Sequence, residues 1–415
     1  MMLELQPRTD FAIELPTSML NGKLMTPKLQ SVKREGTVKV VTLFFLSLLL
    51  LLIAFGTCLG GLSSLQLART SFPPPEVNSF VPVSHTHEDT EEEKKSISNE
   101  EILRDYIIQL KSEEWYWGGT SLHHNMSDEE LFWKASSVAG EPLNCVSKVA
   151  FMFLTKGPLP LAPLWEAYFK GNEDYYSIYV HTVPGYTLDV PSWSVFHGRQ
   201  IPSQAVQWGD ISMVDAERRL LGNAILDSSN ERFILLSETC IPLHSFSTFY
   251  DYVIQSQHSF VGVMDELGPY GRGRYTIKMK PEISLDQWRK APQWFEVTRY
   301  LALYIVTDET YYPKFRNFCK PPCYSDEHYI PTFLSIYFGS QLANRSLTAT
   351  DWSRGGPHPT MYRNNDITTN LLNRLRNNSN CFYNGNPGHT CYFFARKFSR
   401  DTLEPLQQLH HQALN

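Results

Sequence analysis

A single apolar stretch near the N-terminus constrains the organisation of the whole chain. No charged side chain occurs from Val40 to Leu62 (VVTLFFLSLLLLLIAFGTCLGGL), and about 20 apolar residues suffice for a helix to cross a bilayer. A cleaved signal peptide is the alternative, but its apolar core is shorter and lies nearer the first methionine. The sequence therefore predicts an uncleaved transmembrane anchor at residues 40–62, preceded by a tail of residues 1–39.

The charges that flank this span predict its orientation. Basic residues cluster in the stretch that precedes it: Lys23, Lys28, Lys33, Arg34 and Lys39. Arg69 and then an acidic run from Glu88 to Glu93 follow it. By the positive-inside bias, the tail faces the cytosol and everything after residue 62 is lumenal or extracellular.

Three N-glycosylation triplets lie beyond the span, at Asn125, Asn344 and Asn377. Glycosylation enzymes of the secretory pathway would reach them in this orientation. Each triplet alone is a weak signal because such triplets occur by chance. All three agree with a lumenal domain.

The cysteines also suit an oxidising compartment. Six of the seven lie beyond the span: Cys145, Cys240, Cys319, Cys323, Cys381 and Cys391. Their even number predicts disulfides, although the pairing is not readable from the sequence. The Cys319–Cys323 spacing resembles half of a zinc site, but no second Cys pair or His pair of zinc-site spacing accompanies it. No metal site is predicted.

Composition separates a stem from a folded domain. Residues 63–145 contain three consecutive prolines and the run EDTEEEKK, which are typical of a solvated stem. Two helical patterns with capping boxes, beginning at Ser98 and Ser127, would join this stem to the domain. The chain is 42% hydrophobic and 13% aromatic, mostly after residue 145, so we predict one domain at 146–415. The net charge of -6 gives no reason to expect nucleic acid as a partner.

The order of patterns in this domain predicts an α/β fold. Apolar runs at 149–155, 176–183 and 232–236 alternate with helical patterns at 161–171 and 211–226. Runs that are apolar on both faces indicate a parallel sheet covered on both sides. Ligands bind at the edge where such strands end. No dinucleotide-binding or P-loop glycine motif occurs, which disfavours those two kinds of site.

Five further motifs occur in a characteristic order: FILLSETCIPLHSF, WRKAPQWFEVTRYLALYIV, CYSDEHYIPTFL, DWSRGGPHP and CYFFARKF. Together, over about residues 146–408, they resemble the core-2/I-branching β-1,6-N-acetylglucosaminyltransferases, most closely the plant-type (brittle-culm-like) branch. The resemblance implies a GT-A type, Rossmann-like nucleotide-sugar transferase in a type II Golgi membrane protein. It also implies a UDP-sugar donor, a glycan or glycoprotein acceptor, and inverting chemistry without a metal cofactor.

Such a transfer needs a base for the acceptor hydroxyl and a cation for the departing diphosphate. Asp326 and Glu327 lie at an expected helix start with Ser325 as its cap, where carboxylates ordinarily complement the helix dipole. The resemblance instead makes Glu327 the base. Asp326 is the neighbouring candidate, but adjacent helical residues point about 100° apart.

For the diphosphate, the resemblance places Lys397 against the leaving phosphates and Arg354 as a second cation. A basic pair exposed at a strand end is the alternative for Lys397. The phosphate-binding arginine of the animal enzymes has no clean counterpart, since Arg363 has a different spacing. No Asp-x-Asp metal motif occurs in the domain, and Glu238 alone makes a poor metal site.

Three further residues are weaker candidates. His181, at the tip of the second strand, stands where the animal enzymes have an aspartate near the nucleoside, and a structural histidine is the alternative. Arg274 and Trp294 are candidate acceptor-binding residues, although tryptophan is more often a core residue than a sugar platform. The resemblance thus implies transfer of N-acetylglucosamine from UDP-GlcNAc, with another nucleotide sugar or a non-catalytic glycan-binding protein as alternatives.

Overall fold

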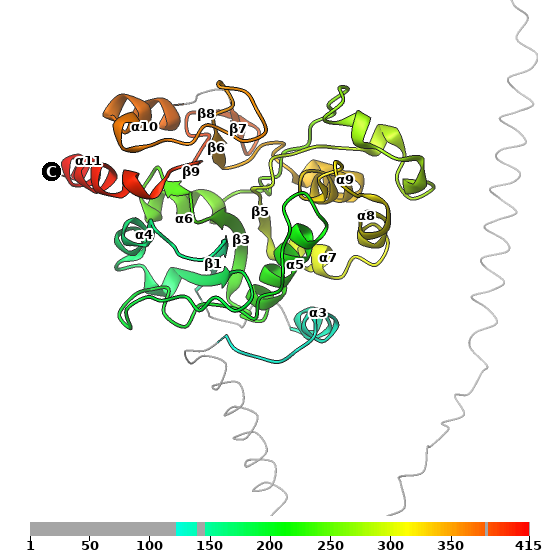
Figure 1. Cartoon of the computed structure of the whole chain (residues 1–415), viewed down its shortest axis with the longest axis horizontal. Helices are drawn as coiled ribbons and strands as arrows, with labels where there is room; N and C mark the ends of the chain where they lie inside the picture. The colour runs from blue at the N-terminus through cyan, green and yellow to red at the C-terminus, as the bar shows by residue number, and fades with distance from the viewer. Residues whose placement is uncertain (1–121, 139–145, 378–380, 415) are drawn as a thin grey trace, which may run out of the picture. The chain divides into compact units, whose positions relative to one another are not determined.

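The structure, a computed structural model, describes residues 122–138, 146–377 and 381–414 (Figure 1). The expected tail, the anchor and most of the expected stem lie outside these residues. No helix within the described part of the chain is both long and apolar enough to cross a membrane.

The central sheet has the predicted βαβαβ order. β1 (Lys148–Leu154), β2 (Tyr176–His181) and β3 (Asn230–Ser237) are parallel, in the spatial order β2-β1-β3. The helices α4 (Ala162–Phe169) and α5 (Ser212–Ile225) connect them. A fourth strand, β5 (Glu296–Thr298), adds to β3 in the antiparallel direction, a feature that the sequence patterns did not predict.

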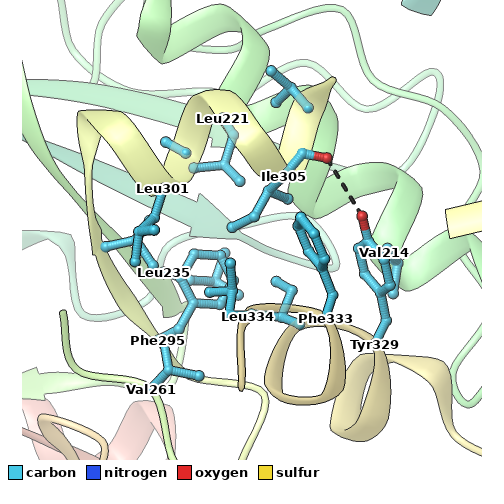
Figure 2. Packing of buried hydrophobic residues seen from close by; sticks show 14 of the residues in the cluster. Val214, Leu221, Leu235, Val261, Phe295, Leu301, Ile305, Tyr329, Phe333 and Leu334 are labelled. Carbon is cyan, nitrogen blue, oxygen red and sulfur yellow. Dashed lines mark hydrogen bonds between the residues drawn. The ribbon is translucent and has the colours of Figure 1, made fainter. Parts of the chain in front are cut away.

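Helices cover both faces of this sheet, as predicted. Ala150 and Met152 of β1 belong to one hydrophobic cluster, with α5 and α7 (Arg299–Val306). Phe151 and Phe153 belong to another, with α4 and α6 (Phe246–Ile254). Successive strand side chains point to opposite faces, so a strand apolar on both faces requires helices on both. Figure 1 shows α4 and α6 on one side of β1 and β3, and α5 and α7 on the other. Figure 2 shows the first cluster, in which Leu235 of β3 packs among residues of α7 and α9.

A second, three-stranded sheet extends the edge at which β3 ends. Its order is β4-β9-β6, comprising β4 (Ile241–Pro242), β9 (Phe394–Arg396) and β6 (Thr348–Thr350). β4 follows β3 after a short turn and pairs with β9, so Lys397 lies close to the end of β3. The remaining elements are α8 (Tyr312–Phe318), α9 (Ser325–Phe338), α10 (Thr369–Arg376), β7 (Cys381–Tyr383), β8 (Asn386–Gly388) and α11 (Leu403–Leu414).

One helix of the expected stem packs onto the domain. α3 (Asp128–Ser137) begins with the predicted capping box, in which the Ser127 hydroxyl accepts from the Glu130 amide and the Glu130 carboxylate accepts from the Ser127 amide. Arg219 of α5 donates two hydrogen bonds to Asp128, at 2.6 and 2.8 Å. α3, which lies in the predicted stem, therefore contacts α5 of the domain, and the boundary at residue 146 stays a prediction.

Disulfides are present, as predicted. Cys319 pairs with Cys323, and Cys381 pairs with Cys391. Cys240 is a buried free thiol, and Cys145 lies outside the described residues. The Cys319–Cys323 pair thus closes a short loop just before α9.

Candidate active site

The three parallel strands end side by side, as the sequence predicted. Leu154 at the end of β1 pairs with His181 of β2 and with Ser237 of β3. The Thr155 amide donates to the His181 carbonyl at 2.9 Å. The loops that carry Lys156 and Glu238 therefore begin at one edge of the sheet.

Lysine, arginine and histidine side chains from three segments gather at this edge. Burial, and then the charges of Arg396 and Lys156, lower the pKa of Lys397, while Glu238 opposes them. Burial and the charges of Lys397, Lys156 and Arg396 likewise lower the pKa of His358. The charges that lower the pKa of Lys397 and of His358 come from lysine and arginine side chains, and such a concentration of positive charge is a favourable place for a polyanion. We call Lys156, Arg396 and Lys397, together with the neighbouring His358, whose lowered pKa leaves its ring neutral near pH 7, the cationic cluster.

Backbone hydrogen bonds hold the DWSRGGPHP loop against the end of β9. The Lys397 amide donates to the Thr360 carbonyl at 3.4 Å, and the Tyr362 amide donates to the Lys397 carbonyl at 2.8 Å. This pairing accounts for the position of His358 beside Lys397. The sequence motifs had indicated Lys397, and Lys156 lies in the loop after the first predicted strand, but nothing in the sequence singled out His358.

Arg354, on the same loop, is placed elsewhere. Its guanidinium is 3.9 Å from Asp366 and largely exposed. It lines a pocket of about 490 Å³ together with Tyr362 and residues of α10. The structure does not bring Arg354 to Lys397, because the loop turns between Arg354 and His358 at two glycines with positive φ, Gly355 and Gly356.

Two of the weaker candidates are buried. Trp294 is 6% exposed, and the Arg396 guanidinium carbon lies 4.0 Å from the centre of its ring. The Trp294 ring therefore packs in the core and supports Arg396, while acceptor binding by Trp294 stays a prediction. His181 is fully buried, its Nε2 lies 3.2 Å from Arg219, and burial lowers its pKa to about 3. Its side chain supports the loop after β2 and presents no surface to a donor.

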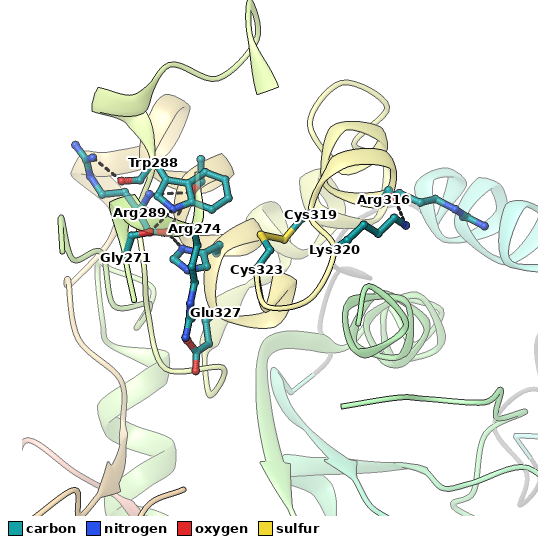
Figure 3. Close-up of a disulfide and its surroundings, with 11 residues drawn as sticks. Gly271, Arg274, Trp288, Arg289, Arg316, Cys319, Lys320, Cys323 and Glu327 are labelled. Carbon is teal, nitrogen blue, oxygen red and sulfur yellow. Dashed lines mark hydrogen bonds and ion pairs between the residues drawn. A yellow bond between two sulfur atoms is a disulfide. The ribbon is translucent and has the colours of Figure 1, made fainter. Parts of the chain in front are cut away.

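The carboxylate of Glu327 lies between two basic side chains. Arg274 Nη1 is 2.6 Å from Glu327 Oε2, and Lys290 Nζ is 3.8 Å from the same oxygen. Figure 3 shows Arg274 directed at Glu327. The structure thus brings together the candidate base and the candidate acceptor-binding arginine. Lys290, in the WRKAPQWF motif, is an additional neighbour that the sequence analysis did not single out.

A proline helps to fix the backbone at Glu327. Pro331, one turn later in α9, has no N–H to donate to the Glu327 carbonyl. That carbonyl accepts from the Ala291 amide at 2.9 Å. His328 Nδ1 also lies 2.7 Å from the Arg289 carbonyl. The first turn of α9 is therefore attached to the segment that carries Lys290.

The helix start differs from the expected one. Tyr324, not Ser325, occupies the cap position, with a left-handed φ of 57°, and no side chain caps the helix. The Ser325 hydroxyl is buried and has no hydrogen-bond partner. The predicted Ser325 cap is wrong because the tight Cys319–Cys323 loop directs the chain into α9 through Tyr324.

Asp326 is not an exposed carboxylate that complements the helix dipole. It is 8% exposed, and burial, followed by the charge of Glu327, raises its pKa to about 7. Its charge in turn helps to raise the pKa of Glu217, a buried residue of α5. Asp326 therefore faces the interior between α9 and α5.

This environment makes a prediction about stability. The unfolded chain ionises Asp326 near its ordinary pKa of 3.8, but the folded chain does so only near 7. Asp326 therefore contributes most to stability below pH 4, and the contribution is lost as the pH rises through 7. Asparagine does not ionise, so Asp326→Asn removes this loss. The free energy of unfolding of the variant minus that of the wild type should therefore be about 2–3 kcal/mol larger at pH 8 than at pH 5. Urea unfolding of both proteins at the two pH values measures it, and a pH-independent difference would contradict the buried state.

The three glycosylation candidates differ in their surroundings. Asn125 and Asn377 are exposed. Asn344 is exposed as well, but its side-chain oxygen accepts from the Val263 amide at 2.6 Å, and Ser346 of the same triplet is buried. Modification of all three stays a prediction.

The domain thus combines an α/β sheet, basic side chains at the edge where its strands end, and a carboxylate, Glu327, at the start of α9. Residues 149–376 match the family model of the Core-2/I-Branching enzyme. The chain is 34% identical over 300 residues to Glycosyltransferase BC10 of Oryza sativa subsp. japonica, covering 61% of this chain and 74% of that protein. The chain belongs to the core-2/I-branching enzyme family, in its plant-type branch, and is a glycosyltransferase. The family implies a nucleotide-sugar donor and a glycan acceptor.

Proposed function

We propose that this glycosyltransferase has the GT-A type fold and transfers N-acetylglucosamine from UDP-GlcNAc to a glycan or glycoprotein with inversion. The observation that supports the proposal is that one domain contains both a partly exposed carboxylate, Glu327, and the cationic cluster. Base and leaving-group stabiliser are the two groups that such a displacement requires.

In the proposed reaction, Glu327 accepts the proton of the acceptor hydroxyl. The hydroxyl oxygen forms a bond to the anomeric carbon while the bond from that carbon to the β-phosphate oxygen breaks. UDP leaves with both electrons of that bond, and Lys397 and Lys156 offset its charge. Attack opposite the leaving group converts the α-linked sugar into a β-linked product.

Arg274 and Lys290 have a second role in this proposal. Both contact Glu327 and both lie on the segment before β5, so they flank the position from which an acceptor would approach the base. Arg274 thereby remains a candidate acceptor-binding residue. Arg354 and His181 are assigned no direct donor contact.

A panel of UDP-sugars tests the function. The purified lumenal portion, residues 63–415, should transfer or hydrolyse UDP-GlcNAc faster than UDP-glucose, UDP-galactose or UDP-xylose. Preference for another sugar would replace the donor assignment but leave the chemistry intact. Glycan binding without turnover of any donor would favour a non-catalytic protein, for which Glu327 and Lys397 have no chemical purpose.

We further propose a single-pass type II protein of the Golgi membrane, with residues 1–39 in the cytosol, an anchor at 40–62 and the catalytic domain in the lumen. The basic tail before the only long apolar stretch supports this topology. Protease added to sealed microsomes should remove the tail and spare the domain, and endoglycosidase should lower its mass. Digestion of the domain in sealed vesicles would contradict the topology.

A further inference from the structure

Trp208 lies between the two halves of the candidate active site. It precedes α5, and its side chain is 54% exposed. Its ring centre is 5.0 Å from that of Tyr324 and 5.3 Å from that of His358. Exposure alone indicates little, since Trp133 and Trp193 are more exposed. The two neighbours of Trp208 are what distinguish it.

Each neighbour belongs to a different end of the proposed reaction. The Arg274 guanidinium carbon lies 4.4 Å from the centre of the Tyr324 ring, and Arg274 contacts Glu327. His358 belongs to the cationic cluster with Lys397. Trp208 therefore joins the candidate base region to the candidate diphosphate region through aromatic contacts.

The residue after Trp208, Gly209, allows the backbone to pass close to Tyr324. Gly209 has a φ of +77°, and a Cβ there would lie 2.9 Å from the Tyr324 ring. A residue with a side chain would be strained by the backbone and would also clash with Tyr324. Glycine thus allows the loop to approach Tyr324 and leaves the Trp208 ring exposed between Tyr324 and His358.

The geometry of the proposed displacement indicates which part of the donor lies beside the Trp208 ring. In an in-line displacement the transferred sugar lies between the attacking oxygen, near the base, and the leaving diphosphate, near the cations. We propose that Trp208 packs its ring against the transferred sugar of the donor, covering an apolar C–H face of the pyranose. This inference rests on the proposed function, because it requires a nucleotide-sugar donor at the cationic cluster.

The proposal predicts a selective loss. Trp208→Ala should weaken binding of UDP-GlcNAc by about 10-fold and slow transfer, since an aromatic contact contributes about 0.5–1.5 kcal/mol, or up to about 13-fold. Binding of UDP, which lacks the sugar, should stay within about twofold of the wild type. Trp208→Phe should retain an intermediate affinity, and Trp133→Ala on α3 is the matched control for loss of an exposed tryptophan.

Calorimetric titration of the full-length protein with UDP and with UDP-GlcNAc separates the outcomes. Equal weakening of both ligands would overturn the proposal, because it would place the ring at the nucleotide or in the structure of the loop. Unchanged affinity for both ligands would also overturn it. So would a variant whose initial rates show a change only in the KM for the acceptor. A wild-type protein that neither binds UDP nor turns over any donor would instead refute the proposed function itself.

Discussion

Glu327→Gln should reduce turnover by about 100- to 10,000-fold, the usual contribution of a general base. The amide has nearly the same size and can still accept a hydrogen bond from Arg274, which is 2.6 Å from Glu327 Oε2 in the wild type. It cannot take a proton from the acceptor hydroxyl. UDP binding should therefore stay near normal, and initial rates with UDP-GlcNAc at saturating acceptor measure the loss.

Asp326→Asn is the matched control for this change. The two carboxylates are adjacent in sequence, but Asp326 is buried and Glu327 is partly exposed. We expect Asp326→Asn to alter the pH dependence of stability while the turnover of folded protein stays within a few-fold of the wild type. An inactive Asp326→Asn with a fully active Glu327→Gln would assign the base to Asp326, and full activity of both variants would refute the mechanism.

Lys397→Ala should reduce turnover by about 100- to 1000-fold, because it removes one preorganised stabiliser of the leaving diphosphate. Lys397 is held in place by the backbone pairing of residues 360–362 with 397–399, so the variant should keep its melting temperature. Lys156→Ala should act in the same direction. Arg354→Ala should have little effect, since this side chain lies beside Asp366; a loss as large as that of Lys397→Ala would return Arg354 to the donor site.

The same proposal predicts that activity does not depend on a divalent metal. Transfer should persist in excess EDTA, because protein cations are assigned the role that a metal has in many enzymes of this fold. Among the described residues, no group of three or more His, Cys, Asp or Glu side chains is arranged to hold a metal ion. Loss of activity in EDTA with recovery on adding manganese would contradict the assignment.

The sequence determined the parts of this protein that depend on local pattern. Three apolar runs and two helical patterns predicted the βαβαβ order, because burial on both faces leaves a continuous apolar signature in a strand. The Ser127 capping box was readable for the same reason, since both of its hydrogen bonds form within four residues. The order of five motifs was enough to indicate the family.

Other features arose only when distant segments met. Arg274 and Glu327 are separated by a long stretch of chain, and their contact depends on the attachment of α9 to the segment before β5. Asp326, Trp294 and His181 are buried, so their surroundings differ from those expected of exposed side chains. The sequence shows which groups can ionise or stack, but not which segments cover them. Trp208 likewise gained its significance only from the two rings that the fold places beside it.

The difference has one physical reason. Strand and helix patterns, caps and membrane spans are determined by interactions within a few residues or by the medium around a segment, so they leave a signature in the sequence. The exposure and electrostatic environment of a side chain are determined by long-range packing, which brings loops from β1, β9 and α9 together at one edge of the sheet. The sequence therefore indicated Glu327 and Lys397 through the family motifs, whereas the tertiary structure decided which neighbours, among them Lys156, His358 and Lys290, surround them.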